Sequence, residues 1–198
     1  MKDKINSPKG RVNLFQITDD GVWLPQARTT NTVLYDWGFI AAKAIGEGDQ
    51  SYRVNVMYIE FENVSPSTDP ATVPSFTRDE GTAYYTGLSD PRDYLRVELL
   101  GLPGISIESG YESYFTAGET GNLLTFLAQS SGSTGVNGTT FSTAQNSKVS
   151  GAALVAAPVF ADSTQDVVFS RTYFNPTSDQ VLKQASSQIG LSWEVPFT

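Results

Sequence analysis

Carboxylates are the residues with which this chain could do chemistry, because it contains no histidine and no cysteine. Two pairs are close in the sequence, Glu60 with Glu62 and Asp79 with Glu80. Paired carboxylates can hydrolyse glycosides without any histidine. In a strand, residues two apart share a face, which places the Cα atoms of Glu60 and Glu62 about 7 Å apart. Such pairs also occur by chance in acidic β proteins, so a solvent-exposed strand surface is the favoured interpretation.

Two acidic turns and one glycine-rich segment are the remaining candidates for a bound ion or cofactor. Asp19-Asp20-Gly21 is shorter than a calcium-binding loop, and turn chemistry explains it. Gly46-Glu47-Gly48-Asp49 offers two carboxylates, but it also has the composition of a helix end. The glycines at 132, 135 and 138 are not followed by the Gly-Lys-Ser or Gly-Lys-Thr of a phosphate-binding loop. We therefore expect no metal and no cofactor.

The absence of histidine and cysteine argues against an enzyme. Without histidine there is no Ser-His-Asp triad and no histidine metal ligand. Without cysteine there is no disulfide, no thiolate zinc site and no cysteine nucleophile. Most hydrolytic chemistry at neutral pH uses histidine or a metal. We therefore expect a protein without enzymatic activity.

Charge and hydropathy indicate which partners to expect. The net charge is −8 at pH 7, and the thirteen Lys and Arg residues form no basic stripe. An acidic chain repels phosphate backbones, so we expect no nucleic-acid partner. The sequence has no long apolar run, and no apolar segment follows the lysines near its start. We therefore expect neither a membrane span nor a signal peptide.

Alternating apolar residues, separated by turn signals about every 8–12 residues, predict an all-β fold: an antiparallel sandwich or barrel, jelly-roll-like. Residues 52–62 form the clearest long strand, and both faces are apolar in the middle, which predicts burial on two sides. Asp19-Asp20-Gly21 predicts a tight turn before a strand that Pro25 should end. The other strands are expected at residues 11–17, 22–24, 82–85, 94–100, 105–108, 111–116, 123–129, 149–160, 167–173 and 188–195.

One short helix is expected near residues 32–45. Apolar residues recur there at helical spacing, at Val33, Trp37, Ile40 and Ala44. Thr30 or Asn31 could cap its start, and Gly46 should end it. A further patch at residues 179–186 predicts one or two helical turns.

Two long polar segments, at residues 65–80 and 129–147, interrupt the single β domain that we expect over residues 1–198. The first is either an ordered surface loop or an arm that reaches a neighbouring subunit. The second is either a flexible loop or a segment that becomes ordered against a partner. We expect subunit contacts in these two segments, at Pro66, Pro70, Pro74, Phe76, Val136 and Phe141.

Aromatic residues allow two interpretations. Exposed rings could form a sugar-binding platform, and rings are also typical of cores and subunit interfaces. With three tryptophans in 198 residues, core and interface use is favoured. The rings concerned are Trp23, Tyr35, Trp37, Tyr84, Tyr85, Tyr111, Tyr114 and Trp193.

Residues 31–63 resemble a module of tailed-bacteriophage virion structural proteins. Asn31-Thr-Val-Leu-Tyr-Asp-Trp-Gly-Phe-Ile-Ala-Ala-Lys-Ala-Ile-Gly corresponds to an alanine-rich short helix that begins near an asparagine. Tyr52-Arg-Val-Asn-Val-Met-Tyr-Ile-Glu-Phe-Glu-Asn63 corresponds to a strand of the form aromatic-x-x-Tyr-Ile-x-Phe. The resemblance implies a homo-oligomeric structural protein, either a capsid decoration or a part of the tail or fibre attachment. Its partners would be copies of itself and other virion proteins, and it would reach the virion from the host cytoplasm.

Two other functions stay open. A carbohydrate-binding, receptor-recognition β-sandwich would present an exposed aromatic row and bind glycans as a stable monomer. A histidine-free glycosidase would lose turnover on a single change of Glu or Asp. The resemblance and the lack of catalytic residues favour the structural virion protein over both.

Overall fold

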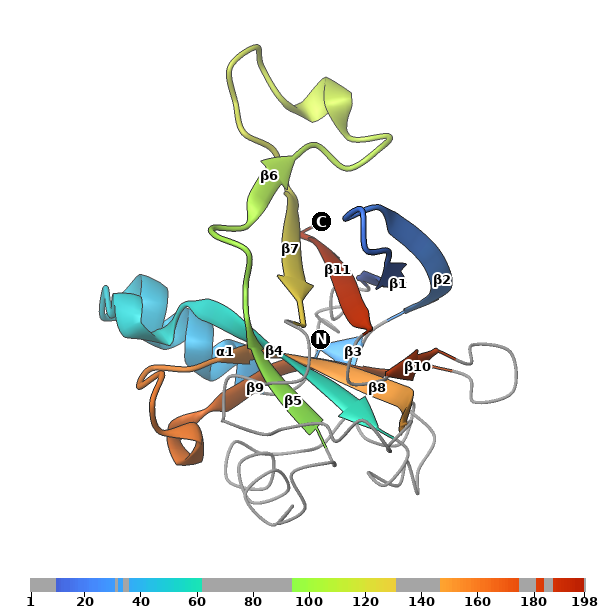
Figure 1. Cartoon of the computed structure of the whole chain (residues 1–198). Helices are drawn as coiled ribbons and strands as arrows, with labels where there is room; N and C mark the ends of the chain where they lie inside the picture. Colours follow the sequence, from blue (N-terminus) through green and yellow to red (C-terminus); the bar gives the residue numbers. More distant parts are fainter. Residues whose placement is uncertain are drawn as a thin grey trace.

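Two antiparallel β-sheets packed against each other form the body of this protein (Figure 1). The structure is a computed structural model. It describes residues 10–30, 32–33, 36–61, 94–130, 147–174, 181–183 and 187–197. Little helix is present in these ranges. The predicted all-β, antiparallel fold with one short helix is confirmed.

The first sheet contains five strands in the order β2-β1-β11-β7-β6. Strands β1 and β2 form a hairpin whose turn contains Gly21 at φ +78°, where glycine is favoured. Strand β11 pairs with β1 on one side and β7 on the other. The bounds are β1 Arg11–Ile17, β2 Trp23–Thr30, β6 Gly104–Ser106, β7 Leu123–Gln129 and β11 Gln188–Pro196.

The second sheet has the order β3-β9-β8-β4-β5, and the two-residue strand β10 also pairs with β8. All of its pairings are antiparallel. The bounds are β3 Thr32–Val33, β4 Val54–Phe61, β5 Tyr94–Glu98, β8 Ser147–Ala156, β9 Val167–Tyr173 and β10 Leu182–Lys183.

The two sheets are joined at both edges. At one edge β2 ends at Thr30 and β3 begins two residues later, and the Thr172 hydroxyl donates to the Thr30 carbonyl at 2.8 Å. At the other edge the chain passes from β5 to β6, and the Leu100 amide donates to the Leu127 carbonyl at 2.7 Å. Strands that switch sheets are typical of sandwiches whose sheets cross, as these do in Figure 1. The fold therefore lies between the sandwich and the barrel that the sequence left open.

The main core lies between the sheets, and a second apolar cluster lies on the outer face of the second sheet. Strand β4 contributes alternate residues to both, so its predicted burial on two sides is confirmed. The main core includes Val12, Leu14, Phe126, Leu191 and Trp193 from the first sheet and Met57, Ile59, Leu95, Leu154 and Phe169 from the second. The outer cluster is Val56, Tyr58, Ala153, Val155, Ala157 and Val168.

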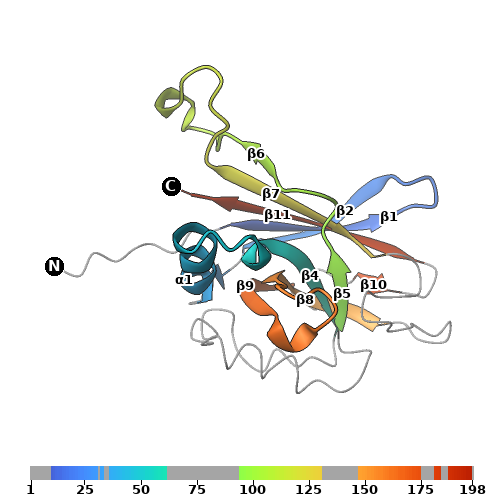
Figure 2. The same cartoon turned by 90° about the vertical axis from the view of Figure 1, so that its left-hand side faces the viewer.

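A short helix covers one end of the space between the sheets (Figure 2). Helix α1 spans Asp36–Ala41 and continues as the π-turn η1, Ala42–Gly46, so Gly46 ends it as expected. The predicted start was wrong by several residues, because Thr32–Val33 pairs with β9 as strand β3. β-Branched residues favour that conformation. Among the described residues there are also three single 3₁₀ turns: η2 Gln50–Tyr52, η4 Glu112–Tyr114 and η5 Ser163–Gln165.

Three further strand and turn predictions were wrong. Strand β2 continues through Pro25, because β2 is an edge strand whose outer side needs no donor. Residues 111–116, expected as a strand, contain the 3₁₀ turn η4. Leu182–Lys183, expected in a helical turn, pairs with β8 as β10.

Several predictions fall outside the described residues. They include the strand at residues 82–85, the loop at 65–80 and most of the segment at 129–147. All six expected subunit contacts lie in these two segments, at Pro66, Pro70, Pro74, Phe76, Val136 and Phe141. The carboxylates of Glu62, Asp79 and Glu80 also lie outside the described residues.

Candidate functional site

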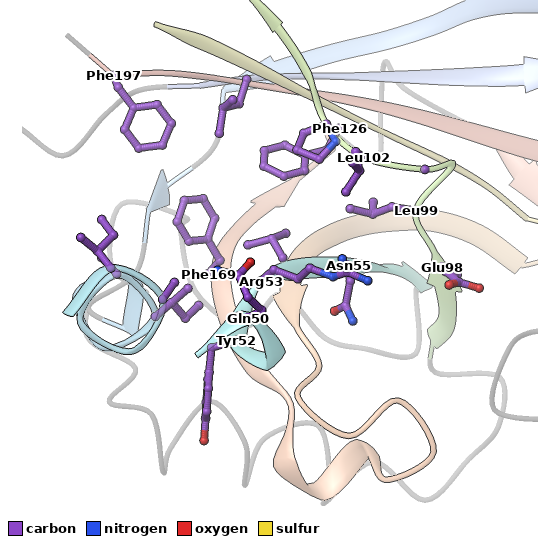
Figure 3. Close-up of a pocket in the computed structure, with 18 residues that line it drawn as sticks. Gln50, Tyr52, Arg53, Asn55, Glu98, Leu99, Leu102, Phe126, Phe169 and Phe197 are labelled. Atoms are coloured by element: carbon purple, nitrogen blue, oxygen red, sulfur yellow. The ribbon is translucent and has the colours of Figure 1, made fainter. Parts of the chain in front are cut away.

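A pocket of about 770 Å³ opens between the two sheets beside the short helix (Figure 3). One wall is the face of α1 and η1 that carries the small residues Ala41 and Ala44. The floor is formed by Phe126 of β7 and Phe169 of β9, both of which belong to the main core. The pocket is therefore a continuation of the core that the helix leaves unfilled. Its volume is in the range of natural ligand sites.

The pocket ends where strand β4 begins, and a bulge shapes this edge. Asn55 is the extra residue, between the pairs Val54 with Ala156 and Val56 with Val155. Its side-chain amide donates to the Ala157 carbonyl at 3.1 Å and accepts from the Ala157 amide at 2.8 Å. These bonds replace the ladder bonds that the bulge interrupts. The Asn55 amide therefore serves the fold and is not available to a ligand.

Exposed apolar side chains form a rim around the pocket, from three separate parts of the chain. Ile45 of η1 is 84% exposed, Leu102 of the β5–β6 connection is 79% exposed, and Phe197 is 44% exposed. Figure 3 shows Leu102 and Phe197 above the pocket. Single exposed apolar residues are common, but a group of them around an apolar hollow is typical of an interaction site. We call Ile45, Leu102 and Phe197 the apolar rim.

The pocket has few polar groups apart from Asn55. Arg53 lies in its middle, and Glu98 lies at the side away from the helix (Figure 3). Among the described residues, Arg53 forms no ion pair. Glu98 is the single carboxylate among the described residues that line the pocket. A glycosidase needs two carboxylates that flank one bond, and this lining offers no such pair.

Glu60 is fully buried on the outer face of the second sheet, so its predicted place on a solvated strand surface was wrong. Arg171 of β9 donates to both of its carboxylate oxygens, at 2.9 and 2.8 Å. The pair spans strand β8, where a Cβ on Gly151 would lie 2.8 Å from Glu60 Oε2. The Arg171 guanidinium also lies over the ring of Tyr173, at 4.4 Å from its centre. The pair therefore requires that β8 lie between β4 and β9, and that β8 carry a glycine at position 151.

A second buried pair joins β5 to the β8–β9 connection. Arg96 donates to both carboxylate oxygens of Asp166, at 2.7 and 2.9 Å, and to the Phe160 carbonyl at 2.6 Å. The Tyr58 hydroxyl also donates to Asp166. Burial, and then the charge of Asp166, raise the pKa of Tyr58 well above its usual range. Burial raises the pKa of Asp166, and the hydrogen bonds from Arg96 and Tyr58 oppose that rise.

These two pairs have structural rather than catalytic geometry. Each carboxylate receives both of its charged hydrogen bonds from one guanidinium. Neither Glu60 nor Asp166 lines the pocket. Buried pairs of this kind specify which strands meet, because separating them leaves an uncompensated charge.

The aromatic residues considered as a sugar-binding platform are dispersed where the structure describes them. Trp193 is buried in the main core, and Trp23 packs edge-on against Phe15. Tyr111 and Tyr114 lie together in the β6–β7 connection. Apart from Tyr111 and Tyr114, the described rings therefore share no surface. The side chains of Tyr35, Trp37, Tyr84 and Tyr85 are outside the described residues.

The apolar rim was not identified from the sequence. Leu102 was the available signal, because it stands between Gly101 and Pro103 in a turn that contains two glycines. A large apolar residue in such a turn is unusual unless it contacts something. Ile45 and Phe197 gave no comparable signal, since both continue apolar patterns of neighbouring residues.

Within the part of the chain that the structure describes, no group of three or more Asp or Glu residues could hold a metal ion. In those ranges, no helix has the length and apolar character needed to cross a membrane.

Replacing Arg171 with methionine should lower the free energy of unfolding by about 3–5 kcal/mol, because Glu60 keeps its buried charge and loses its guanidinium. Chemical denaturation of the purified variants measures the effect. The matched control is Arg28→Met in edge strand β2, where the side chain is exposed and the expected change is within about 0.5 kcal/mol. Equal effects at the two positions would contradict the structural role of the pair.

Replacing Tyr58 with phenylalanine should change how stability depends on alkaline pH. The pKa of Tyr58 is raised in the folded state, so the unfolded chain releases the phenol proton first, near pH 10. The stability that Tyr58 contributes is complete below that pH and declines above it, by up to about 1.4 kcal/mol per pH unit. Unfolding free energies at pH 8–11 should show this decline in the wild type and in the exposed control Tyr114→Phe. A decline of the same slope in Tyr58→Phe would contradict the prediction.

Comparison with known proteins adds no relative to this description. No family model matches the chain. No curated protein and no solved structure matches it either. Its function is therefore argued from its own residues and geometry.

Proposed function

We propose that this chain is a non-enzymatic structural protein that assembles with copies of itself in the virion of a tailed bacteriophage. The observation that carries the proposal is the apolar rim around an unfilled continuation of the core. Burying such a surface between subunits is the usual driving force of assembly, and closed symmetry is its usual outcome.

The free energy gained by burying the rim can be compared with the cost of association. Full burial of a Leu, Ile or Phe side chain contributes about 1.5–3 kcal/mol, and Phe197 is already half-buried, so the rim contributes roughly 5 kcal/mol. Association costs about 4–15 kcal/mol in lost freedom. The rim alone is therefore close to break-even, and a stable oligomer needs a partner that also fills the pocket.

The lack of catalytic geometry among the described residues supports a non-enzymatic role. The pocket lining contains one carboxylate, and the buried carboxylates of Glu60 and Asp166 are held by arginines on the other face of the second sheet. The chain contains no histidine or cysteine that could supply a base or a nucleophile.

The virion assignment rests on the resemblance of residues 31–63. In the structure this module is the short helix followed by β4. It supplies one wall of the pocket and the strand that both apolar clusters share. A module that builds both the core and the open pocket suits a protein whose surface is completed by neighbours. Head decoration and a place in the tail or fibre attachment are equally compatible with this geometry.

Light scattering coupled to size exclusion tests the proposal. The wild type should form one discrete oligomer. Leu102→Asp should raise the dissociation constant of the oligomer at least tenfold, because a charge would replace an apolar rim contact. Val22→Asp is the matched control, since Val22 is 53% exposed in the β1–β2 turn and does not line the pocket. A wild-type chain that stays monomeric at every concentration and does not bind virus particles would refute self-assembly, and glycan binding would then be measured.

A further inference from the structure

The β6–β7 connection, residues 107–122, projects from the body of the molecule (Figures 1 and 2). We call it the excursion. None of its residues is buried, and none of them lines the pocket of its own chain. It leaves the body directly after β6, whose preceding residue Pro103 is part of the pocket wall. One chain therefore carries an open apolar hollow and, next to it, an arm that points away from that hollow.

The shape of the excursion is specified by its own residues. Asn122 Oδ1 accepts from the Glu108 amide at 3.0 Å, and the Glu119 carboxylate accepts from the Thr116 amide at 2.6 Å. Gly121 has φ +106°, and a Cβ there would lie 2.2 Å from the Ser106 carbonyl oxygen. Ordering a segment costs about 1–2 kcal/mol per residue. Local hydrogen bonds without burial recover little of that cost, so we infer that the excursion is ordered to bury its surface elsewhere.

Two tyrosines at the excursion's 3₁₀ turn η4 supply that surface. The rings of Tyr111 and Tyr114 lie 5.8 Å apart, and Tyr114 is 77% exposed. Tyrosine gives large contact area for the loss of few side-chain rotations, and it is enriched among the residues that dominate binding energy. We call Tyr111 and Tyr114 the tyrosine pair.

We propose that the tyrosine pair of one copy fills the pocket of a second copy of this chain. The inference rests on the proposed self-assembly, and it identifies the tyrosine pair and the pocket as the two surfaces that would meet. The pocket lining is mostly apolar and is interrupted by Gln50, Arg53, Asn55 and Glu98, so an aromatic pair would meet chiefly aliphatic and aromatic side chains there. Contact between two different surfaces of the same chain is heterologous: it forms a ring when the rotation between copies closes, and an open filament when it does not.

Contact area supports this partner. A fully buried aromatic side chain contributes about 150–250 Å², and Tyr111 and Tyr114 are 37% and 77% exposed, so the pair would supply roughly a quarter to a third of the about 800 Å² that each partner buries in a standard interface. Ile105 of β6, which is also exposed, lies at the base of the same excursion. The apolar rim supplies matching surface on the other copy.

Charge supports the same partner. Residues 107–122 contain three glutamates and no lysine or arginine. Glu108 already pairs with Arg11 of β1, so Glu112 and Glu119 are the carboxylates that the arm could bring to a neighbour. The pocket holds Arg53, which has no ion pair among the described residues and lies between the helix and Glu98 (Figure 3). An acidic arm that enters beside Arg53 compensates its charge, whereas a basic partner would leave it unpaired. Glu98 lies on the far side of the pocket from the rim residue Phe197 (Figure 3).

Two complementary variants test the inference by light scattering coupled to size exclusion. Tyr114→Ala removes the arm's exposed ring and keeps the pocket, while Ile45→Asp places a charge in the pocket and keeps the arm. Each alone should weaken association at least tenfold. Val22→Asp is the matched control, since its side chain is exposed and belongs to neither surface. Circular dichroism checks that every variant is folded.

An equimolar mixture of the two defective variants gives the decisive result. One intact pocket and one intact arm remain, so the mixture should form a complex of two chains that does not grow further. If the mixture stays monomeric, the arm does not dock in the pocket. If Tyr114→Ala assembles like the wild type while Leu102→Asp does not, the excursion is excluded and self-assembly through the rim still stands. A wild type without any self-association overturns the docking and the proposed function together.

Discussion

Strand β4 is buried on both faces, and this constraint determines most of the structure. A strand in that position can carry a charge only if the charge is paired, because an isolated buried carboxylate is far too costly. Glu60 is paired by Arg171 across β8, and Gly151 leaves the space that the pair needs. Beside it, Tyr58 shares Asp166 with Arg96. The strand order β9-β8-β4-β5 thus brings each of these charged side chains next to its partner.

The sequence was sufficient for the elements whose pattern is local. Strands β1, β7 and β9 begin and end where alternation predicted them, because their apolar period matches one buried face or a continuous buried run. The Asp19-Asp20-Gly21 turn was equally readable from its glycine. Predictions failed where a distant partner decides. Thr32–Val33 forms a strand because it pairs with the edge of β9. Strand β2 continues through Pro25 because no strand pairs with its outer side, where the missing proline N–H would otherwise be needed.

The candidate site was harder to predict than the fold for the same reason. A pocket is a property of how distant segments meet, and its lining comes from the helix, the start of β4, the β5–β7 region, Phe169 of β9 and Phe197. Composition could exclude chemistry that needs histidine or cysteine, because missing residue types are visible without a structure. It could not show that Glu60 is buried, since Glu60 and its partner Arg171 are 111 residues apart. Nor could it show that Ile45 and Phe197 belong to one rim.

The two ends of β4 therefore have different tasks. Towards Phe61 the strand is closed on both sides by core and charge pairs, although its pairing with β8 has a second register shift, between Glu60 and Phe61. Towards Val54 a bulge ends the ladder, Asn55 satisfies the freed backbone groups, and the core opens into the pocket. This separation allows a hollow to open into water without destabilising the sheet. The charge pairs stabilise the strand order, and none of their residues lines the pocket. The apolar surface at the open end is then free to be selected for contact with a neighbour rather than for stability of the single chain.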